Sequence, residues 1–155
     1  MDTTDKLKFY SIKIITALAF TMFAYRALVQ ILASDTLQPN LVLLLISESI
    51  TVALILAARP AKDYAANAIA LLSTFVVTFY FLVINISSGQ TLLPAFITIT
   101  LQIVGMLLQI TAKLYLGRSF GLVAANRGVV TSGPYKFVRH PIYFGYLIVH
   151  VGFLL

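Results

Sequence analysis

The sequence predicts an all-α fold, a polytopic transmembrane helix bundle, and three observations support this prediction. Of the 155 residues, 60% are hydrophobic and only 10% are charged, whereas soluble domains carry about a quarter charged residues. The apolar residues form stretches near the length of about 20 residues that a membrane-spanning helix needs. The Lys and Arg residues fall almost entirely in alternate connections between these stretches. We therefore expect a single integral membrane domain, residues 1–155.

Four complete spans are predicted, and each break between them has a local cause. The first gap contains Pro39, and the third contains Ser87-Ser88-Gly89 and Pro94. Arg59-Pro60 should end the second helix, because a proline disfavours the α conformation of the residue before it. The first apolar stretch is too long for the core of a cleaved signal peptide. The spans are expected at residues 10–33, 41–57, 64–86 and 95–116.

A fifth span should begin at Pro141, since proline suits the first turn of a helix. Residues 141–155 reach only about 22 Å at about 1.5 Å per residue, short of a hydrocarbon core of about 30 Å. The chain is therefore expected to end inside the membrane. Either the last helix is a half-span or, as we favour, it is the start of a fifth span in a longer protein.

The distribution of positive charge predicts the orientation. With the N-terminus in the cytoplasm, the expected outer loops carry Asp35 and no Lys or Arg. The formal charge of +6 then fits loops that face anionic lipid headgroups, and nucleic acid is the less favoured partner. The basic residues that this orientation places on or near the cytoplasmic side are Lys6, Lys8, Lys13, Arg59, Lys62, Lys113, Arg118, Arg127, Lys136 and Arg139.

Arg26 and Glu48 lie well inside predicted spans, away from the ends. Arg26 and Glu48 should lie at the same depth on adjacent antiparallel helices, and an ionisable group in hydrocarbon is costly unless it is paired. A structural ion pair between them is the favoured interpretation. The alternative is a substrate or ion pathway through a small multi-span transporter or channel, helped by the hydroxyls of Ser47, Ser49 and Thr51.

Metal and thiol chemistry are not expected. The chain has no Cys, and its two His and five acidic residues are scattered. It therefore offers neither a thiolate site nor a cysteine nucleophile, and no metal is predicted.

The segment 117–140 is the only long polar stretch, and it is expected to be a cytoplasmic loop that carries the chemistry. A long loop without helical pattern is usually functional or disordered, and its Val and aromatic residues argue against disorder. Asn126-Arg127-Gly128 between short apolar runs predicts a hairpin turn. Gly133-Pro134 predicts a second turn.

The end of this loop combines a cation, an imidazole and a helix start. Pro141 biases His140 toward extended geometry, which places His140 at the N-cap of the fifth helix next to Arg139. Free N–H groups and the positive end of a helix dipole favour an anion there. Tyr135 and Tyr143 flank the position and offer flat rings and hydroxyls. The alternative is that these residues only mark the membrane interface.

Three motifs in this region, taken in order, resemble a known family. They are Leu116-Gly117-Arg118-Ser119-Phe120, Ala125-Asn126-Arg127-Gly128-Val129-Val130, and Gly133-Pro134-Tyr135-Lys136-Phe137-Val138-Arg139-His140-Pro141-Ile142-Tyr143-Phe144-Gly145. Together they look like the signature of the isoprenylcysteine carboxyl methyltransferase family. The Arg-His-Pro motif is shared with the membrane phospholipid methyltransferases.

The resemblance implies a membrane-embedded methyltransferase that uses S-adenosyl-L-methionine and acts on a lipophilic acceptor, with a prenylcysteine carboxylate as the family prototype. It implies that Arg139 and His140 are the catalytic residues, either meeting the methionine carboxylate or fixing the loop, while the tyrosines line the adenosine or sulfonium. His140 is the nearest candidate base for an amine or thiol acceptor. The cofactor-binding residues carried over are Gly133, Tyr135, Arg139, His140 and Tyr143.

The sequence also departs from the family pattern. In the family, the last helix is followed by a glutamate-bearing segment and a tail that help to close the cofactor pocket, and no such segment follows Leu155. The chain is therefore expected to be truncated, with only part of the site. A non-catalytic relative, whose spans serve only assembly, is a further possibility.

Overall fold

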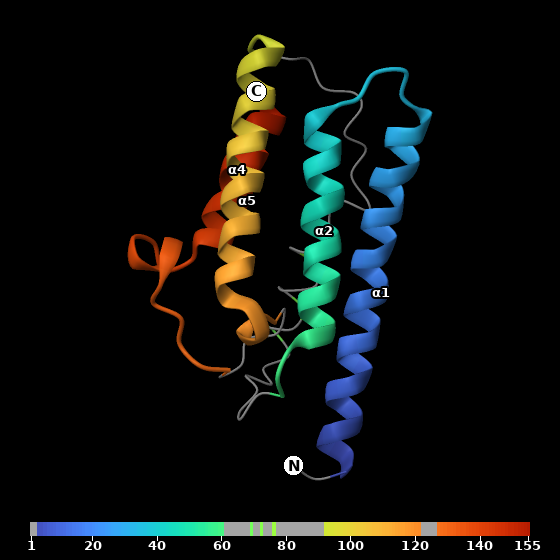
Figure 1. The fold of residues 1–155 in the computed structure, drawn as a ribbon, viewed down its shortest axis with the longest axis vertical. Helices are drawn as coiled ribbons and strands as arrows, with labels where there is room; N and C mark the ends of the chain where they lie inside the picture. Colours follow the sequence, from blue (N-terminus) through green and yellow to red (C-terminus); the bar gives the residue numbers. More distant parts are fainter. Residues whose placement is uncertain (1–2, 61–68, 70–71, 73–75, 77–91, 122–126) are drawn as a thin grey trace.

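The computed structural model describes residues 3–60, 69, 72, 76, 92–121 and 127–155. These residues form helices joined by turns and loops, with no strand among them, so the all-α prediction is confirmed for this part of the chain. Figure 1 shows the arrangement. The elements are α1 (Thr3–Ala33), α2 (Pro39–Ala57), α4 (Ala95–Leu116), η3 (Gly117–Ser119), η4 (Gly133–Lys136) and α5 (Pro141–Leu154).

The helices form two antiparallel pairs that meet along α2 and α4. In Figure 1, α1 lies beside α2, and α4 lies beside α5. Contacts between α2 and α4 join the pairs. The loop after α4 projects from the lower part of the α4–α5 pair in the same view. We call this end of the bundle the loop end.

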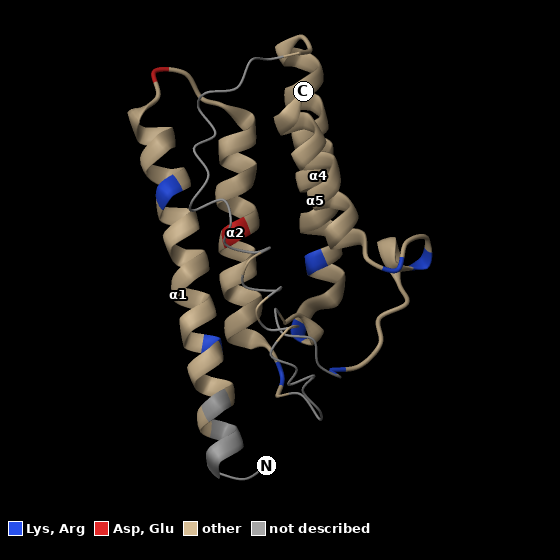
Figure 2. Ribbon diagram, turned by 180° about the vertical axis from the view of Figure 1, so that it is seen from behind, with Lys and Arg blue, Asp and Glu red and all other residues tan. Residues whose placement is uncertain are grey.

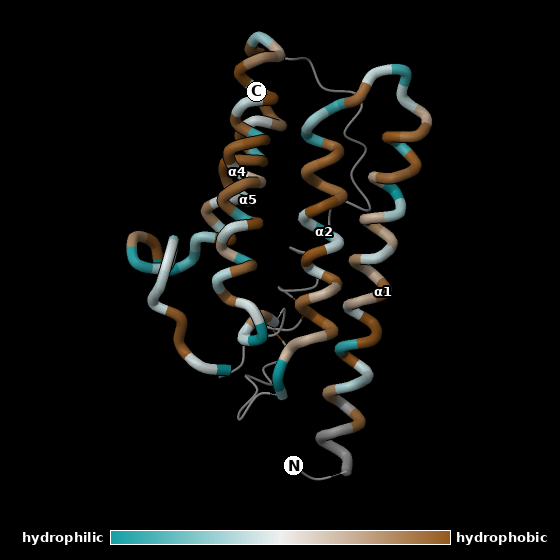
Figure 3. The backbone as a smooth tube through the Cα atoms, in the orientation of Figure 1, coloured by the Kyte–Doolittle hydropathy of each residue, from teal (hydrophilic) through white to brown (hydrophobic). Residues whose placement is uncertain are grey.

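Three of the described helices are long and apolar enough to cross a membrane, at Phe9–Ala33, Pro39–Ala57 and Ala95–Ser119. A shorter apolar helix follows at Pro141–Leu154. Figure 3 shows hydrophobic residues along most of each helix and hydrophilic ones mainly toward the ends and in the loop. Many large apolar side chains, such as Leu18 and Leu114, face outward, as expected where lipid replaces water. The chain is therefore an integral membrane protein.

The helix bounds lie close to the predicted segments. α4 has the expected bounds, and α5 begins at Pro141 as expected. α2 begins two residues earlier than expected, with Pro39 in its first turn, and α1 extends back to Thr3. The predicted third span, 64–86, lies outside the described residues, so the total number of spans stays a prediction.

Glycines allow α4 and α5 to pack with their backbones close together. A Cβ on Gly105 would lie 2.7 Å from the carbonyl oxygen of Gly145, and one on Gly145 would lie 2.8 Å from that of Gly105. Further along, a Cβ on Gly152 would lie 2.8 Å from the carbonyl oxygen of Thr98. Small residues allow this close approach between helices in a membrane. The α4–α5 pair is therefore held in one register.

That register sets where the chain's last residue lies relative to α4. The N–H groups of Leu92 and Leu93 donate to the carbonyl of Leu155, at 2.5 and 2.7 Å. The last turn of α5 is therefore level with the start of α4. α5 has 14 residues against 22 in α4, so α5 falls short at the loop end.

Candidate functional site

The first part of the loop is anchored to the end of α2. The Arg118 side chain donates from Nε to the carbonyl of Ala57 at 3.3 Å. The backbone N–H of Arg59 donates to the carbonyl of Arg118 at 3.1 Å. The Arg127 side chain in turn donates from Nε to the carbonyl of Arg59 at 3.2 Å. The side chains of Arg118 and Arg127 therefore bind the loop to the backbone at the end of α2.

Arg127 lies beside the start of the loop. Ser119 donates from its hydroxyl to the carbonyl of Arg127 at 3.1 Å. The Arg127 guanidinium occupies the space that a side chain on Gly121 would need. Gly128 has a φ of 103°, which favours glycine. The predicted hairpin turn includes Asn126, which lies outside the described residues, and the residues described on either side form no strand.

The short helix η4 packs against the last turns of α4. Gly133 has a φ of 58°, and a Cβ there would lie 2.5 Å from the ring of Tyr115. The Tyr135 hydroxyl donates to the backbone carbonyl of Ala112 at 3.4 Å. Burial raises the pKa of this hydroxyl to about 12. Gly133 and Tyr135, both predicted site residues, thus hold the loop against α4. The Tyr135 hydroxyl already has a backbone carbonyl as its hydrogen-bond partner.

Arg139 and His140 lie at the start of α5. His140 is the N-cap residue, with a φ of −131° and a ψ of 65°, and it makes no side-chain cap hydrogen bond. Its ψ lies short of the extended range that a following proline favours. Arg139 and His140 are both exposed, whereas Pro141 is buried. The first-turn N–H groups of α5 are thus left without a side-chain cap beside two basic side chains.

The predicted site residues form two neighbouring groups. Gly133 and Tyr135 lie in η4 on α4, while Arg139, His140 and Tyr143 lie at the start of α5. In the second group, the rings of His140 and Tyr143 meet edge to face with centroids 5.9 Å apart. Among the described residues, no hydrogen bond, ion pair or ring contact connects the two groups. They are close along the chain but are positioned independently, one by α4 and the other by the first turn of α5.

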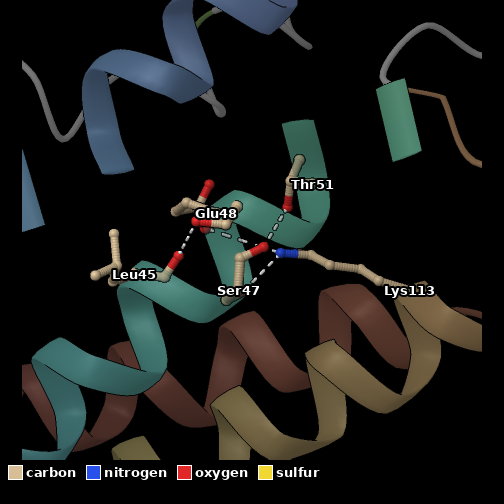
Figure 4. Close-up of polar contacts among 6 residues, drawn as sticks. Leu45, Ser47, Glu48, Thr51 and Lys113 are labelled. Carbon is tan, nitrogen blue, oxygen red and sulfur yellow. Dashed lines mark hydrogen bonds and ion pairs between the residues drawn. The ribbon is translucent and has the colours of Figure 1, made fainter. Parts of the chain in front are cut away.

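The structure also contains a buried polar cluster that the sequence analysis did not predict, formed by Ser47, Glu48, Lys113 and Tyr146. Lys113 donates from Nζ to the Ser47 hydroxyl at 2.8 Å and lies 3.8 Å from Oε1 of Glu48. Its Nζ also lies over the ring of Tyr146, 5.8 Å from the centroid. Figure 4 shows Lys113 reaching from α4 to the two α2 residues. The cluster joins α2, α4 and α5.

This cluster corrects the predicted ion pair. Glu48 pairs with Lys113 and not with Arg26, whose side chain is exposed on α1 beside Tyr25 and Gln30. Lys113, which the predicted orientation places on or near the cytoplasmic side, has a side chain that is only 1% exposed. In the sequence, the position of Lys113 inside the predicted span 95–116 was the feature that could have indicated its burial. The transporter or channel alternative required Arg26 and Glu48 along the first two helices, and it is not favoured.

Comparison with known proteins finds a family match in the C-terminal part of the chain. Residues 96–155 match the isoprenylcysteine carboxyl methyltransferase (ICMT) family. No significant match is found among curated proteins or among solved structures. Within the described residues, no group of three His, Cys, Asp or Glu could hold a metal ion. The matched residues contain α4 from its second residue, the described part of the loop and α5. Over residues 96–155, the chain is thus similar to the isoprenylcysteine carboxyl methyltransferase family.

Proposed function

We propose that this protein is a membrane methyltransferase that takes its methyl group from S-adenosyl-L-methionine and transfers it to a lipophilic acceptor. The observation that carries the proposal is the uncapped start of α5 beside exposed Arg139 and His140, inside the segment that matches the family. The family match over residues 96–155 supports methyl transfer in a membrane. The cofactor, the acceptor and the residue roles are our inference.

The residues at the start of α5 fit the chemistry of this cofactor. S-adenosyl-L-methionine has a carboxylate, a flat adenine ring and a sulfonium whose methyl group is already activated for transfer. Arg139 and the free N–H groups of the first turn suit the carboxylate. The His140–Tyr143 ring pair suits the adenine ring or the sulfonium. We assign binding of the cofactor's carboxylate to Arg139 and His140. We assign contact with its adenine ring or sulfonium to Tyr143.

Gly133 and Tyr135 have a different part in this proposal. Because the Tyr135 hydroxyl binds the Ala112 carbonyl and Gly133 lies against Tyr115, we assign both residues to the fixed wall of the cofactor pocket. His140 remains the candidate base for an amine or thiol acceptor, which must lose a proton. A carboxylate acceptor needs no base, and the site then acts by positioning alone.

We further propose that the loop end faces the cytoplasm. Most of the described Lys and Arg residues gather toward that half of the bundle in Figure 2. The opposite end carries Asp35 in the turn between α1 and α2. Positive residues are retained on the cytoplasmic side during insertion. Reaction of a single introduced cysteine at exposed Phe137 with an impermeant reagent, in sealed cells, tests this orientation.

Titration of S-adenosyl-L-methionine into the protein in lipid nanodiscs tests the proposed function. His140→Ala and Arg139→Gln should each weaken binding by about tenfold, equivalent to about 1.4 kcal/mol. Lys136→Gln is the matched control, because Lys136 is an exposed basic residue of the same loop outside the proposed site. It should bind within about twofold of the parent protein. Equal affinities in all four proteins, or no binding by the folded parent, would contradict the proposal.

A further inference from the structure

The buried polar cluster is incompletely satisfied within the described part of the chain. The Nζ–Oε1 distance between Lys113 and Glu48 is 3.8 Å, longer than a direct charge-assisted hydrogen bond. The second carboxylate oxygen, Oε2, is fully buried and has no hydrogen-bond partner among the described residues. A buried acceptor left in this state costs about 1–3 kcal/mol. The cluster therefore presents an acceptor suited to a further hydrogen-bond donor.

The charges of the cluster restrict what that donor can be. Glu48 and Lys113 form one negative and one positive group, both almost entirely buried. A ligand carboxylate or ammonium would leave a net buried charge, which is costly inside a membrane. A neutral hydroxyl adds no charge. It can donate to Oε2 of Glu48 while accepting from the Lys113 ammonium, which, within the described part of the chain, donates a hydrogen bond to Ser47.

The cluster is linked to the candidate cofactor site along α5. Tyr146 contacts Lys113, and Tyr143, three residues earlier on the same helix, contacts His140. Residues three apart are neighbours on a helix surface. His140, Tyr143 and Tyr146 thus form a row from the loop to Glu48 and Lys113. A polar group held at the cluster would lie on the side of α5 that carries the proposed cofactor site.

We propose that the buried polar cluster binds the neutral hydroxyl group of an apolar molecule, with Glu48 as acceptor and Lys113 as donor. This proposal goes beyond the proposed function and does not rest on it. Binding itself needs no cofactor, so the two proposals can fail separately. The ligand class is a long-chain or cyclic alcohol whose apolar part stays in the bilayer.

Glu48 gives this proposal a direct spectroscopic test, because it is the only glutamate in the sequence. Protein labelled with carboxyl-13C glutamate and held in nanodiscs should show one labelled carboxylate band in the infrared. Addition of 1-dodecanol should shift this band to saturation, whereas dodecane should leave it unchanged and dodecylammonium should act much more weakly. A band that dodecanol does not move would overturn the proposal without bearing on cofactor binding.

Photolabelling with a diazirine-bearing long-chain alcohol provides the second measurement. Labelling of α2, α4 or α5 near the cluster should saturate and should be displaced by dodecanol but not by dodecane. Glu48→Gln should reduce labelling by about fivefold, which corresponds to about 1 kcal/mol. Ser49→Ala is the matched control, because the Ser49 hydroxyl is exposed and donates to the carbonyl of Leu45 on its own helix. Equal labelling in a folded Glu48→Gln protein would make the cluster a purely structural ion pair.

Discussion

The Tyr135 hydroxyl donates a hydrogen bond to the backbone carbonyl of Ala112, with 3.4 Å between the two oxygens. The next residue on α4, Lys113, reaches in another direction to Ser47 and Glu48 on α2. Adjacent residues of one helix thus hold the loop on one side and α2 on the other. A change in the last turns of α4 should therefore affect both the loop and the α2–α4 contact.

The raised pKa of Tyr135 predicts a pH dependence. Its value is about 12 in the folded protein, against an ordinary 10.0, so folding disfavours the ionised phenol. The contribution of this group to stability is complete below about pH 10 and is lost as the pH rises toward 12. The difference in tyrosinate absorbance between the parent protein and Tyr135→Phe should titrate near the higher value. A difference centred on the ordinary pKa would contradict the described burial of the phenol.

Gly133→Ala should loosen the loop. Alanine at a φ of 58° is strained by about 1–2 kcal/mol, and its Cβ would overlap the Tyr115 ring. Amide hydrogen exchange in residues 127–140 should accelerate, while exchange in α2 stays unchanged. Adding Tyr115→Ala should restore part of the protection by removing the overlap but not the strain. Ser132→Ala, at an ordinary φ of −100°, is the control and should exchange like the parent.

Breaking the Glu48–Lys113 pair should destabilise the protein more than removing Arg26. Removal of one partner of a buried ion pair costs about 3–5 kcal/mol, because the other charge remains buried. Lys113→Gln should therefore lower the Tm in detergent clearly, and exchanging the two residues (Glu48→Lys with Lys113→Glu) should recover part of the loss. Arg26→Gln should change the Tm little, since Arg26 is exposed. A larger loss from Arg26→Gln than from Lys113→Gln would contradict the described pairing.

Gly105→Ala should separate α4 from α5. The added Cβ would lie 2.7 Å from both the Gly145 carbonyl oxygen and a Val149 methyl carbon, and such overpacking typically costs about 1–3 kcal/mol. The free energy of unfolding in mixed micelles measures this cost. Val104→Ala is the control on the neighbouring, 50% exposed position and should cost less than about 0.5 kcal/mol. Equal losses in both variants would show that the glycine contact does not hold the pair together.

The features of the fold that local rules determine were predictable from the sequence. The position of His140 before α5 follows from Pro141, which suits a first helical turn and disfavours helix before it. The bounds of α4 follow from Pro94 and from the polar residues after Leu116. The relation of Gly133 to Tyr115 was not predictable, because it depends on how η4 packs against α4.

The Arg26–Glu48 prediction was wrong for a reason that lies in the packing of the helices. Depth along two adjacent helices was estimated from the sequence, but the rotation of each helix about its axis was not. α1 places Arg26 on an exposed face, whereas α2 places Glu48 on a buried one. The long Lys113 side chain can then reach Glu48 from α4. To find this pair from the sequence, the buried faces of α1, α2 and α4 would have to be predicted together.

The shortness of α5 at the loop end sets the height at which the loop meets the bundle. α5 is eight residues shorter than α4, or about 12 Å at 1.5 Å per residue, and the two helices are level at the other end. Arg139 and His140 are thus set back from the end of α4 along the bundle, toward its middle. An amphiphile could present its polar end to these residues while its hydrocarbon tail stays in its own leaflet.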